Sequence, residues 1–307
     1  TERLAEYHKA DKRRIVCGNG AADMIYRLVC RIKPCQALLP SPTFSEYEQA
    51  LRQAGCRIRF FPLKEEQDFS IDAERMAGML EEGEAVFLCN PNNPTGLALD
   101  AGQVKIIADA CKRKHGLFIL DECFCEFLDK PGDYSFMERI KEYPEAVILR
   151  AFTKSYAMAG LRLGYAVCGD IGLAGRLRLT GQPWSVSVPA QEAGVAALGE
   201  SGYLEQARIL VRQEREWMGR RLAGLGFKVF PSQANYLLFK DEEEHRHGYL
   251  WDGLRKEGIL IRDCGNFNGL ERKEGRDGAR YYRVGIRSHE ENERLLEAVS
   301  DLAKAGG

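Results

Sequence analysis

Short apolar segments alternate with amphipathic ones along the first half of the chain. Three apolar runs are each followed by a segment with helical periodicity: 37–39 by 45–54, 57–61 by 72–80, and 85–89 by 100–114. Such alternation predicts an α/β fold, in which a mostly parallel sheet is covered by helices on both faces. Asp72 and Asp100 stand where the second and third helices should have their N-caps.

The pattern changes in the last third of the chain. Helical periodicity from 189 to 225 predicts long helices that connect two domains, and an amphipathic segment at 290–303 predicts a closing helix. Between them, short apolar runs predict strands near 227–230, 236–239, 259–261 and 282–286. We therefore predict a large domain over 1–196, and a smaller α+β domain with its linking helix over 197–307.

Charge and composition exclude several classes of partner. The 307 residues carry a net charge of −1, which gives no overall attraction to nucleic acid or to an acidic membrane. No apolar run approaches the roughly 18 residues of a spanning helix, and we expect no cleavable leader before Thr1. Ten cysteines in a chain of this length are expected to be reduced thiols of a cytoplasmic protein. Because their spacing does not fit a structural zinc site, we expect no metal.

Polar side chains follow several of the apolar runs, at points where strands are expected to end. Asn93 lies in a proline-rich loop after 85–89, Asp121 closes the apolar run that begins at 116, and Lys154 follows a further predicted strand. Ligands of open α/β sheets usually bind at the carboxyl ends of strands. The sequence therefore predicts that these three side chains share one site.

The chemistry of these residues indicates a particular cofactor. An amine that forms a Schiff base must lose its proton near neutral pH, and an arginine offers a phosphate two parallel hydrogen bonds. Lys154 and Arg162, eight positions later, can therefore hold an aldehyde that carries a phosphate, as pyridoxal 5′-phosphate does. Asp121 would pair with its protonated ring nitrogen, and Asn93 would donate to its ring oxygen.

A glycine turn near the start of the chain adds a candidate anion site. A strand-like run at 14–17 leads through Gly20 into a helical segment at 21–32. Free amides at a helix N-terminus attract phosphate, and the amides after Gly20, beginning with that of Ala21, are the expected donors. Phe44 has two interpretations, either as a plate stacked on the cofactor ring or as an aromatic of the core.

Four further segments carry a family resemblance. They lie at 121–124, 182–186, 259–262, and 281–288 followed by 292–296. With the residues above, they make nearly the whole chain resemble the fold type I pyridoxal-phosphate enzymes of the aminotransferase class I/II superfamily. The closest likeness is to the threonine-phosphate decarboxylases, sisters of the histidinol-phosphate aminotransferases. Phe124 favours the decarboxylases, because the sisters usually have a tyrosine there whose hydroxyl bonds the cofactor.

The resemblance implies pyridoxal 5′-phosphate as the cofactor and a role for each candidate residue. Lys154 is implied as the Schiff-base lysine and, with Asp121, as catalytic. The implied cofactor-binding residues are Lys154, Asp121, Asn93, Arg162, Phe44, Gly20, Ala21 and Thr153. Arg283 resembles the arginine that receives the substrate carboxylate, Arg262 resembles one that contacts the substrate phosphate, and Asn93 is a further substrate contact. A homodimer is implied as well.

The activity implied by the resemblance is decarboxylation of O-phospho-L-threonine to (R)-1-aminopropan-2-yl phosphate, a step of cobalamin biosynthesis. One alternative is an aminotransferase of the histidinol-phosphate type, because the same residues can serve either reaction. A second alternative is not an enzyme: a cofactor-binding sensor domain or an inactive fragment. Carbon dioxide release from O-phosphothreonine distinguishes these hypotheses.

Two departures from the family pattern are expected to matter. The position three before the lysine commonly carries a hydroxyl directed at the cofactor phosphate, whereas this chain has Ala151, so we expect weaker retention of the cofactor. A family-like backbone would direct the hydroxyl of Thr153 elsewhere. In relatives, a segment before the position of Thr1 supplies a glycine-rich arm and a tyrosine that crosses the dimer interface, and we expect this segment to be missing here.

Overall fold

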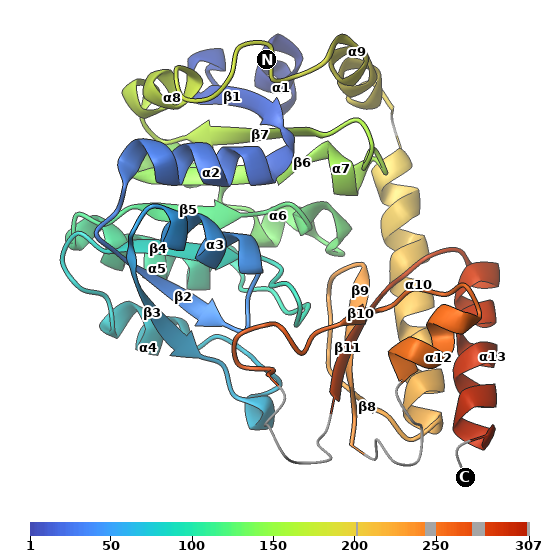
Figure 1. Ribbon diagram of the computed structural model, residues 1–307. Helices are drawn as coiled ribbons and strands as arrows, with labels where there is room; N and C mark the ends of the chain where they lie inside the picture. Colours follow the sequence, from blue (N-terminus) through green and yellow to red (C-terminus); the bar gives the residue numbers. More distant parts are fainter. Residues whose placement is uncertain (201, 243–249, 272–279, 306–307) are drawn as a thin grey trace.

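The computed structural model describes residues 1–200, 202–242, 250–271 and 280–305, which form two sheets with their covering helices (Figure 1). The larger sheet consists of β1 (Ile15–Asn19), β2 (Gln36–Ser41), β3 (Arg57–Pro62), β4 (Ala85–Cys89), β5 (Phe118–Asp121), β6 (Ala146–Ala151) and β7 (Leu163–Cys168). The smaller sheet consists of β8 (Lys228–Val229), β9 (Tyr236–Asp241), β10 (Arg262–Asp263) and β11 (Arg280–Gly285). None of the described helices is long and apolar enough to cross a membrane.

The larger sheet has the strand order β1-β7-β6-β5-β4-β2-β3. The strands from β6 to β3 run parallel to one another, and only β7 runs antiparallel to its two neighbours, β6 and β1. The carboxyl ends of β1, β2, β4, β5 and β6 therefore lie at one edge of the sheet. This mostly parallel sheet confirms the predicted fold class.

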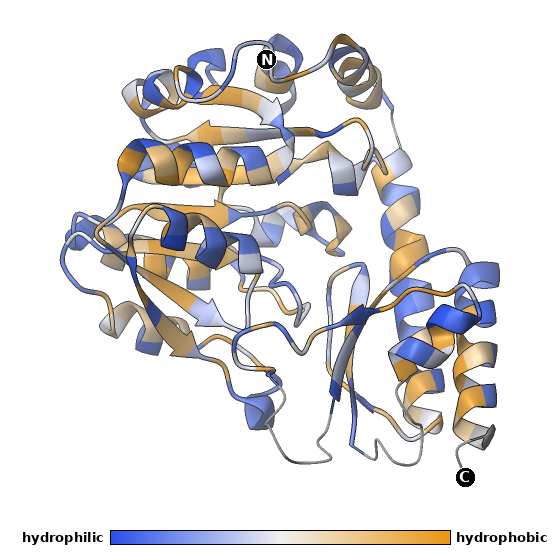
Figure 2. Cartoon of the chain, viewed as in Figure 1, coloured by the Kyte–Doolittle hydropathy of each residue, from blue (hydrophilic) through white to orange (hydrophobic). Residues whose placement is uncertain are grey.

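Helices cover both faces of the larger sheet, because successive strand residues point to opposite sides. Val86 and Leu88 of β4 pack into the core on one side, and Ala85 and Phe87 pack into the core on the other. Figure 2 shows the apolar residues concentrated in these strands and on the helix faces turned towards them. Among the helices that contribute to the two cores are α1 (Glu2–His8), α4 (Ala73–Gly78), α5 (Ala101–Arg113) and α9 (Val188–Ala197) on the first side, and α2 (Gly20–Ile32), α3 (Ser45–Gln53) and α8 (Ile171–Arg178) on the second.

Short helices complete the large domain, and longer ones support the smaller sheet. The short ones are α6 (Pro131–Tyr134), α7 (Phe152–Ser155) and the 3₁₀ turns η1 (Lys12–Arg14), η2 (Glu65–Gln67), η3 (Cys125–Phe127) and η4 (Met137–Glu142). The helices α10 (Tyr203–Gly224), α12 (Leu250–Lys256) and α13 (His289–Ala305) run beside the smaller sheet (Figure 1). They share with it a third core, which contains Met218, Leu254 and Leu296. The proposed boundary at 196/197 stays a prediction.

Helix caps confirm one local prediction, and one predicted strand is wrong. Asp72 accepts a hydrogen bond from the amide of Arg75, and Asp100 forms a full capping box with Gln103. The strand predicted at 259–261 is absent from the described part of the small domain, where β10 begins only at 262. The amide of Ile259 donates to the carbonyl of Leu254 at 2.9 Å. Residue 259 therefore still belongs to the turn that ends α12, although the apolar run suggested a strand there.

Candidate active site

The candidate residues meet because three adjacent parallel strands end at the same edge of the large sheet. Asn93 lies in the loop after β4, Asp121 is the last residue of β5, and Lys154 lies in α7, directly after β6. Strand direction therefore brings together residues that are distant in the sequence, at the edge where ligands of such sheets bind.

These residues line a cavity of about 190 Å³, several times the roughly 30 Å³ that one water occupies in the liquid. Of the sequence-predicted residues, its wall contains Ala21, Phe44, Asn93, Asp121, Thr153, Lys154, Arg162 and Arg283. The remaining wall residues are Ala22, Cys89, Cys123, Phe124 and Ala151. Gly20 lies directly behind the wall, beside Ala21 and Arg162.

Strand pairing places a cation at the N-terminus of α2. Leu163, at the start of β7, pairs with Asn19 at the end of β1, which brings Arg162 next to the first turn of α2. Gly20 has a φ of 83°, and a Cβ atom there would lie only 2.7 Å from Nη2 of Arg162. Glycine therefore allows the guanidinium to approach the N-terminus of α2, and this arrangement is suited to bind an anion.

Asp121 is a buried carboxylate held by two donors. It is 5% exposed. The hydroxyl of Tyr47 donates to Oδ2 at 2.7 Å, and the amide of Cys123 donates to Oδ1 at 3.0 Å. Sequence reasoning missed Tyr47, although it lies on α3 only three positions after Phe44. The available signal was this spacing of three residues. Phe44 is the N-cap of α3, and residues three apart on a helix lie on the same face.

Lys154 has an amine with an altered protonation equilibrium. Its side chain is partly exposed to solvent at the cavity wall, and its Nζ lies 5.7 Å from the ring centroid of Phe124. Partial burial lowers the pKa of Lys154, and the positive charges of Arg283 and Arg162 lower it more than nearby acidic groups raise it. At a given pH, a larger fraction of this amine is therefore neutral than in a fully solvated lysine.

Arg283 reaches from β11 of the small sheet to the loop after β4. Its Nη1 donates to Oδ1 of Asn93, and its guanidinium lies 5.1 Å from the ring centroid of Tyr236. The hydroxyl of Tyr236 in turn donates to the carbonyl of Asn92 at 2.8 Å. The two sheets thus form the cavity together.

Arg262 does not reach the cavity wall. It is exposed, and its Nη2 donates to Oδ1 of Asn266 at 2.8 Å. In the sheet register it is nevertheless the direct partner of Arg283. Arg262 therefore lies on β10, next to the strand that carries Arg283, and outside the wall of the cavity that contains Lys154.

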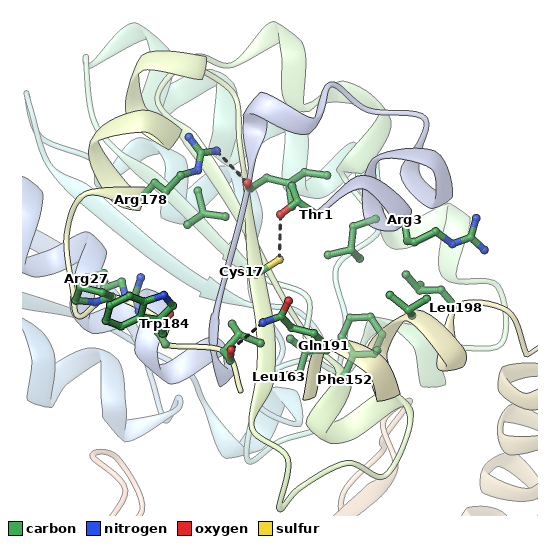
Figure 3. A pocket seen from close by; sticks show the side chains of 18 of the residues that line it. Thr1, Arg3, Cys17, Arg27, Phe152, Leu163, Arg178, Trp184, Gln191 and Leu198 are labelled. Atoms are coloured by element: carbon green, nitrogen blue, oxygen red, sulfur yellow. Dashed lines mark hydrogen bonds between the residues drawn. The ribbon is translucent and has the colours of Figure 1, made fainter. Parts of the chain in front are cut away.

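A larger cavity, of about 410 Å³, lies between α1, β1 and the segment that leads into α9 (Figure 3). Its wall contains none of the sequence-predicted site residues. Arg178 bonds the carbonyl of Ile15, and Gln191 bonds the carbonyl of Val186, as Figure 3 shows. These two polar side chains already donate to backbone carbonyls. The smaller cavity around Lys154 is therefore the better candidate for the active site.

The chain matches the family described as aminotransferase class I and II over residues 1–299. It is 37% identical to the threonine-phosphate decarboxylase of Salmonella typhimurium over 300 residues, which are 97% of this chain and 79% of that protein.

Two solved structures have the same fold. The histidinol-phosphate aminotransferase from Clostridium acetobutylicum superposes with a TM-score of 0.88 at 29% identity, over 99% of this chain and 88% of that one. The histidinol-phosphate aminotransferase from Sinorhizobium meliloti, solved in complex with pyridoxal 5′-phosphate, gives a TM-score of 0.85 at 22% identity, over 100% of this chain and 81% of that one. The chain therefore belongs to the aminotransferase class I and II family, whose members bind pyridoxal 5′-phosphate.

Proposed function

We propose that this protein is a pyridoxal-phosphate-dependent carboxy-lyase. It converts O-phospho-L-threonine to (R)-1-aminopropan-2-yl phosphate and carbon dioxide, as a homodimer that serves cobalamin biosynthesis. The observation that carries this proposal is the position of Phe124, which faces the amine of Lys154 in the same cavity. The 37% identity with the Salmonella decarboxylase supports the same choice.

The cavity has a donor and acceptor set that fits the cofactor. Asp121 would accept from the ring nitrogen. Asn93 would donate its NH₂ group to the ring oxygen, because its Oδ1 already accepts from Arg283. Arg162 and the amides that follow Gly20 would bind the phosphate. Phe44 borders the same cavity as an aromatic surface, and Thr153 is a neighbouring hydroxyl.

In this proposal, Lys154 binds the cofactor through its amine and later moves a proton. Its lowered pKa increases the fraction of the amine that is neutral at a given pH. Nucleophilic attack on an aldehyde requires this neutral form. When bound, pyridoxal 5′-phosphate accepts the electrons of whichever bond to the substrate α-carbon stands perpendicular to its ring. After carbon dioxide has left, Lys154 in its protonated ammonium form would donate a proton to that carbon, having taken the proton up from solvent.

The two arginines of the small sheet suit a substrate with an anion at each end. Arg283 would bind the carboxylate and so decide which bond at the α-carbon is upright. Arg262, its partner in the neighbouring strand, would bind the phosphate. Guanidinium groups form paired hydrogen bonds with both kinds of anion.

An aminotransferase of the histidinol-phosphate type is the second candidate. The Clostridium aminotransferase superposes with a TM-score of 0.88, and the same lysine and aspartate would serve that reaction. Phe124 opposes this candidate, because its side chain has no hydroxyl to offer a cofactor oxygen.

Assays of the purified, cofactor-loaded protein separate the candidates. We expect carbon dioxide release from O-phospho-L-threonine and much less from L-threonine, which lacks the second anion. Lys154→Arg keeps the charge but should abolish the reaction, whereas Lys130→Arg, at an exposed position outside the cavity wall, should leave it unchanged. A protein that transfers amino groups between histidinol phosphate and 2-oxoglutarate, without releasing carbon dioxide, would contradict the proposal.

A further inference from the structure

The carboxylate of Asp121 has an unusual set of partners for a buried charge. Both oxygens accept a hydrogen bond, one from Tyr47 and one from the amide of Cys123. Among the described residues, no lysine or arginine forms an ion pair with it. A buried carboxylate with donors but no cation at ion-pair distance is costly. It is therefore suited to receive a cation from a ligand in the cavity.

We propose that Tyr47 is a positioning residue that fixes the orientation of the Asp121 carboxylate, and through Asp121 controls how tightly the cofactor ring is held. This inference rests on the proposed function, because it assumes that pyridoxal 5′-phosphate occupies the cavity. Tyr47 itself is not part of the cavity wall. It acts on the ligand only through the carboxylate.

The surroundings of Tyr47 hold its hydroxyl in one place. The side chain is fully buried. Its ring lies 5.5 Å from that of Phe44 in an edge-to-face contact and 5.4 Å from that of Phe87. Because these contacts involve the ring alone, they remain when the hydroxyl is removed. The hydroxyl is therefore the group that links α3 to the end of β5.

The hydroxyl remains a donor at neutral pH. Burial, with the negative charge of Asp121 nearby, raises the pKa of Tyr47 well above its ordinary value. Such a donor can satisfy one oxygen of the buried carboxylate, which would otherwise be left without a partner. Without it, Oδ2 of Asp121 would lose the donor that comes from α3, and the carboxylate would be held less firmly by its contacts with Cys123.

Tyr47→Phe tests the inference, with Tyr143→Phe as a matched control. Tyr143 is also buried, and its hydroxyl donates to Oδ1 of Asp109 at 2.7 Å, outside the cavity wall. Cofactor affinity of the apo-protein, measured by fluorescence titration, should fall about tenfold in Tyr47→Phe, as loss of one hydrogen bond to a charged group predicts. The pH midpoint of the cofactor absorbance band should shift as well. Tyr143→Phe should change neither quantity.

Two further variants keep the test decisive. In an Asp121→Asn background, adding Tyr47→Phe should cause no further loss of affinity, because the route through the carboxylate is already broken. Replacing Tyr47 by 3-fluorotyrosine preserves the fold contacts and strengthens the donor, so the absorbance midpoint should move opposite to that of Tyr47→Phe. This variant also answers the question if Tyr47→Phe fails to fold.

The outcomes separate this inference from the proposed function. Parent-like affinity and an unshifted absorbance midpoint in Tyr47→Phe would overturn the role of Tyr47 alone. An equal loss in the parent and Asp121→Asn backgrounds would also overturn it. Failure of the parent protein to bind pyridoxal 5′-phosphate would instead remove the proposed function, and this inference with it.

Discussion

The reactivity expected of Lys154 depends on its neighbours more than on its own chemistry. Burial and the charges of Arg283 and Arg162 lower its pKa. Replacing Arg283 by glutamine removes one positive charge, so the pKa of Lys154 should move up towards its ordinary value. The pH profile of acylation at Lys154 in the apo-protein, followed by mass spectrometry, should shift to higher pH. Arg287→Gln, an exposed position paired with Glu291, is the control that should leave the profile in place.

A substitution at Ala151 is expected to strengthen cofactor binding. Ala151 is buried and lines the cavity three positions before Lys154. A serine there can donate one more hydrogen bond to a phosphate, so Ala151→Ser should bind the cofactor about fivefold more tightly, as one net hydrogen bond predicts. Ala159→Ser, exposed and outside the cavity wall, should not. Unchanged or weaker binding by Ala151→Ser would show that the phosphate does not lie near this position.

At the scale of elements, the junction of β1 and α2 depends on the absence of a side chain. Gly20 and Gly55 both have a positive φ, but an added Cβ atom meets Arg162 at Gly20 and nothing within 4 Å at Gly55. Alanine at either position should cost about 1–2 kcal/mol of unfolding free energy, because a left-handed backbone disfavours a side chain. Only Gly20→Ala should also weaken cofactor binding, by displacing the guanidinium. Equal cofactor affinities of the two variants in a titration would exclude this role for the close approach.

The sequence predicted the elements of the large sheet better than the contacts between them. Asn93 and Asp121 were identifiable because an apolar run followed by polar residues indicates where a strand ends. The bond between Tyr47 and Asp121 joins a helix to a strand 74 residues away, and no local pattern encodes such a pairing. The strand expected at 259–261 was wrong for a related reason, since the closing turn of α12 competed for the same backbone groups.

At the scale of the molecule, the cavity depends on how the small sheet is held against the large one. Arg283 can reach Asn93 only if β11 is placed correctly, and a second set of contacts, outside the cavity wall, helps to place it. Glu65 of η2 accepts hydrogen bonds from Lys228 at 2.8 Å and Lys240 at 2.9 Å, and also from the hydroxyl of Tyr281. Since Tyr281 and Arg283 are both on β11, this cluster positions the same strand that supplies the arginine.

The Glu65 cluster should make the stability of the protein depend on pH. Burial opposes the shift, but hydrogen bonds from Lys228, Tyr281 and Lys240 lower the pKa of Glu65 to about 2. A carboxyl whose folded pKa is depressed stabilises the fold fully above its unfolded pKa, near 4.5, and loses that contribution as the pH falls through about 2. Glu65→Gln should therefore lower the unfolding free energy by about 1–2 kcal/mol at pH 7, as expected for a partly exposed charged network.

Urea unfolding of the apo-protein at several pH values measures this contribution. The difference between parent and Glu65→Gln should be largest at neutral pH and should shrink between pH 4.5 and 2, because protonation removes in the parent the charge that the variant already lacks. Glu66→Gln, exposed and next in the chain, should follow the parent. If the Glu65→Gln difference is independent of pH, the charge of Glu65 does not hold the two sheets together. The aromatic contacts of Phe69 with Phe230 and Tyr281 would then be the next contacts to test.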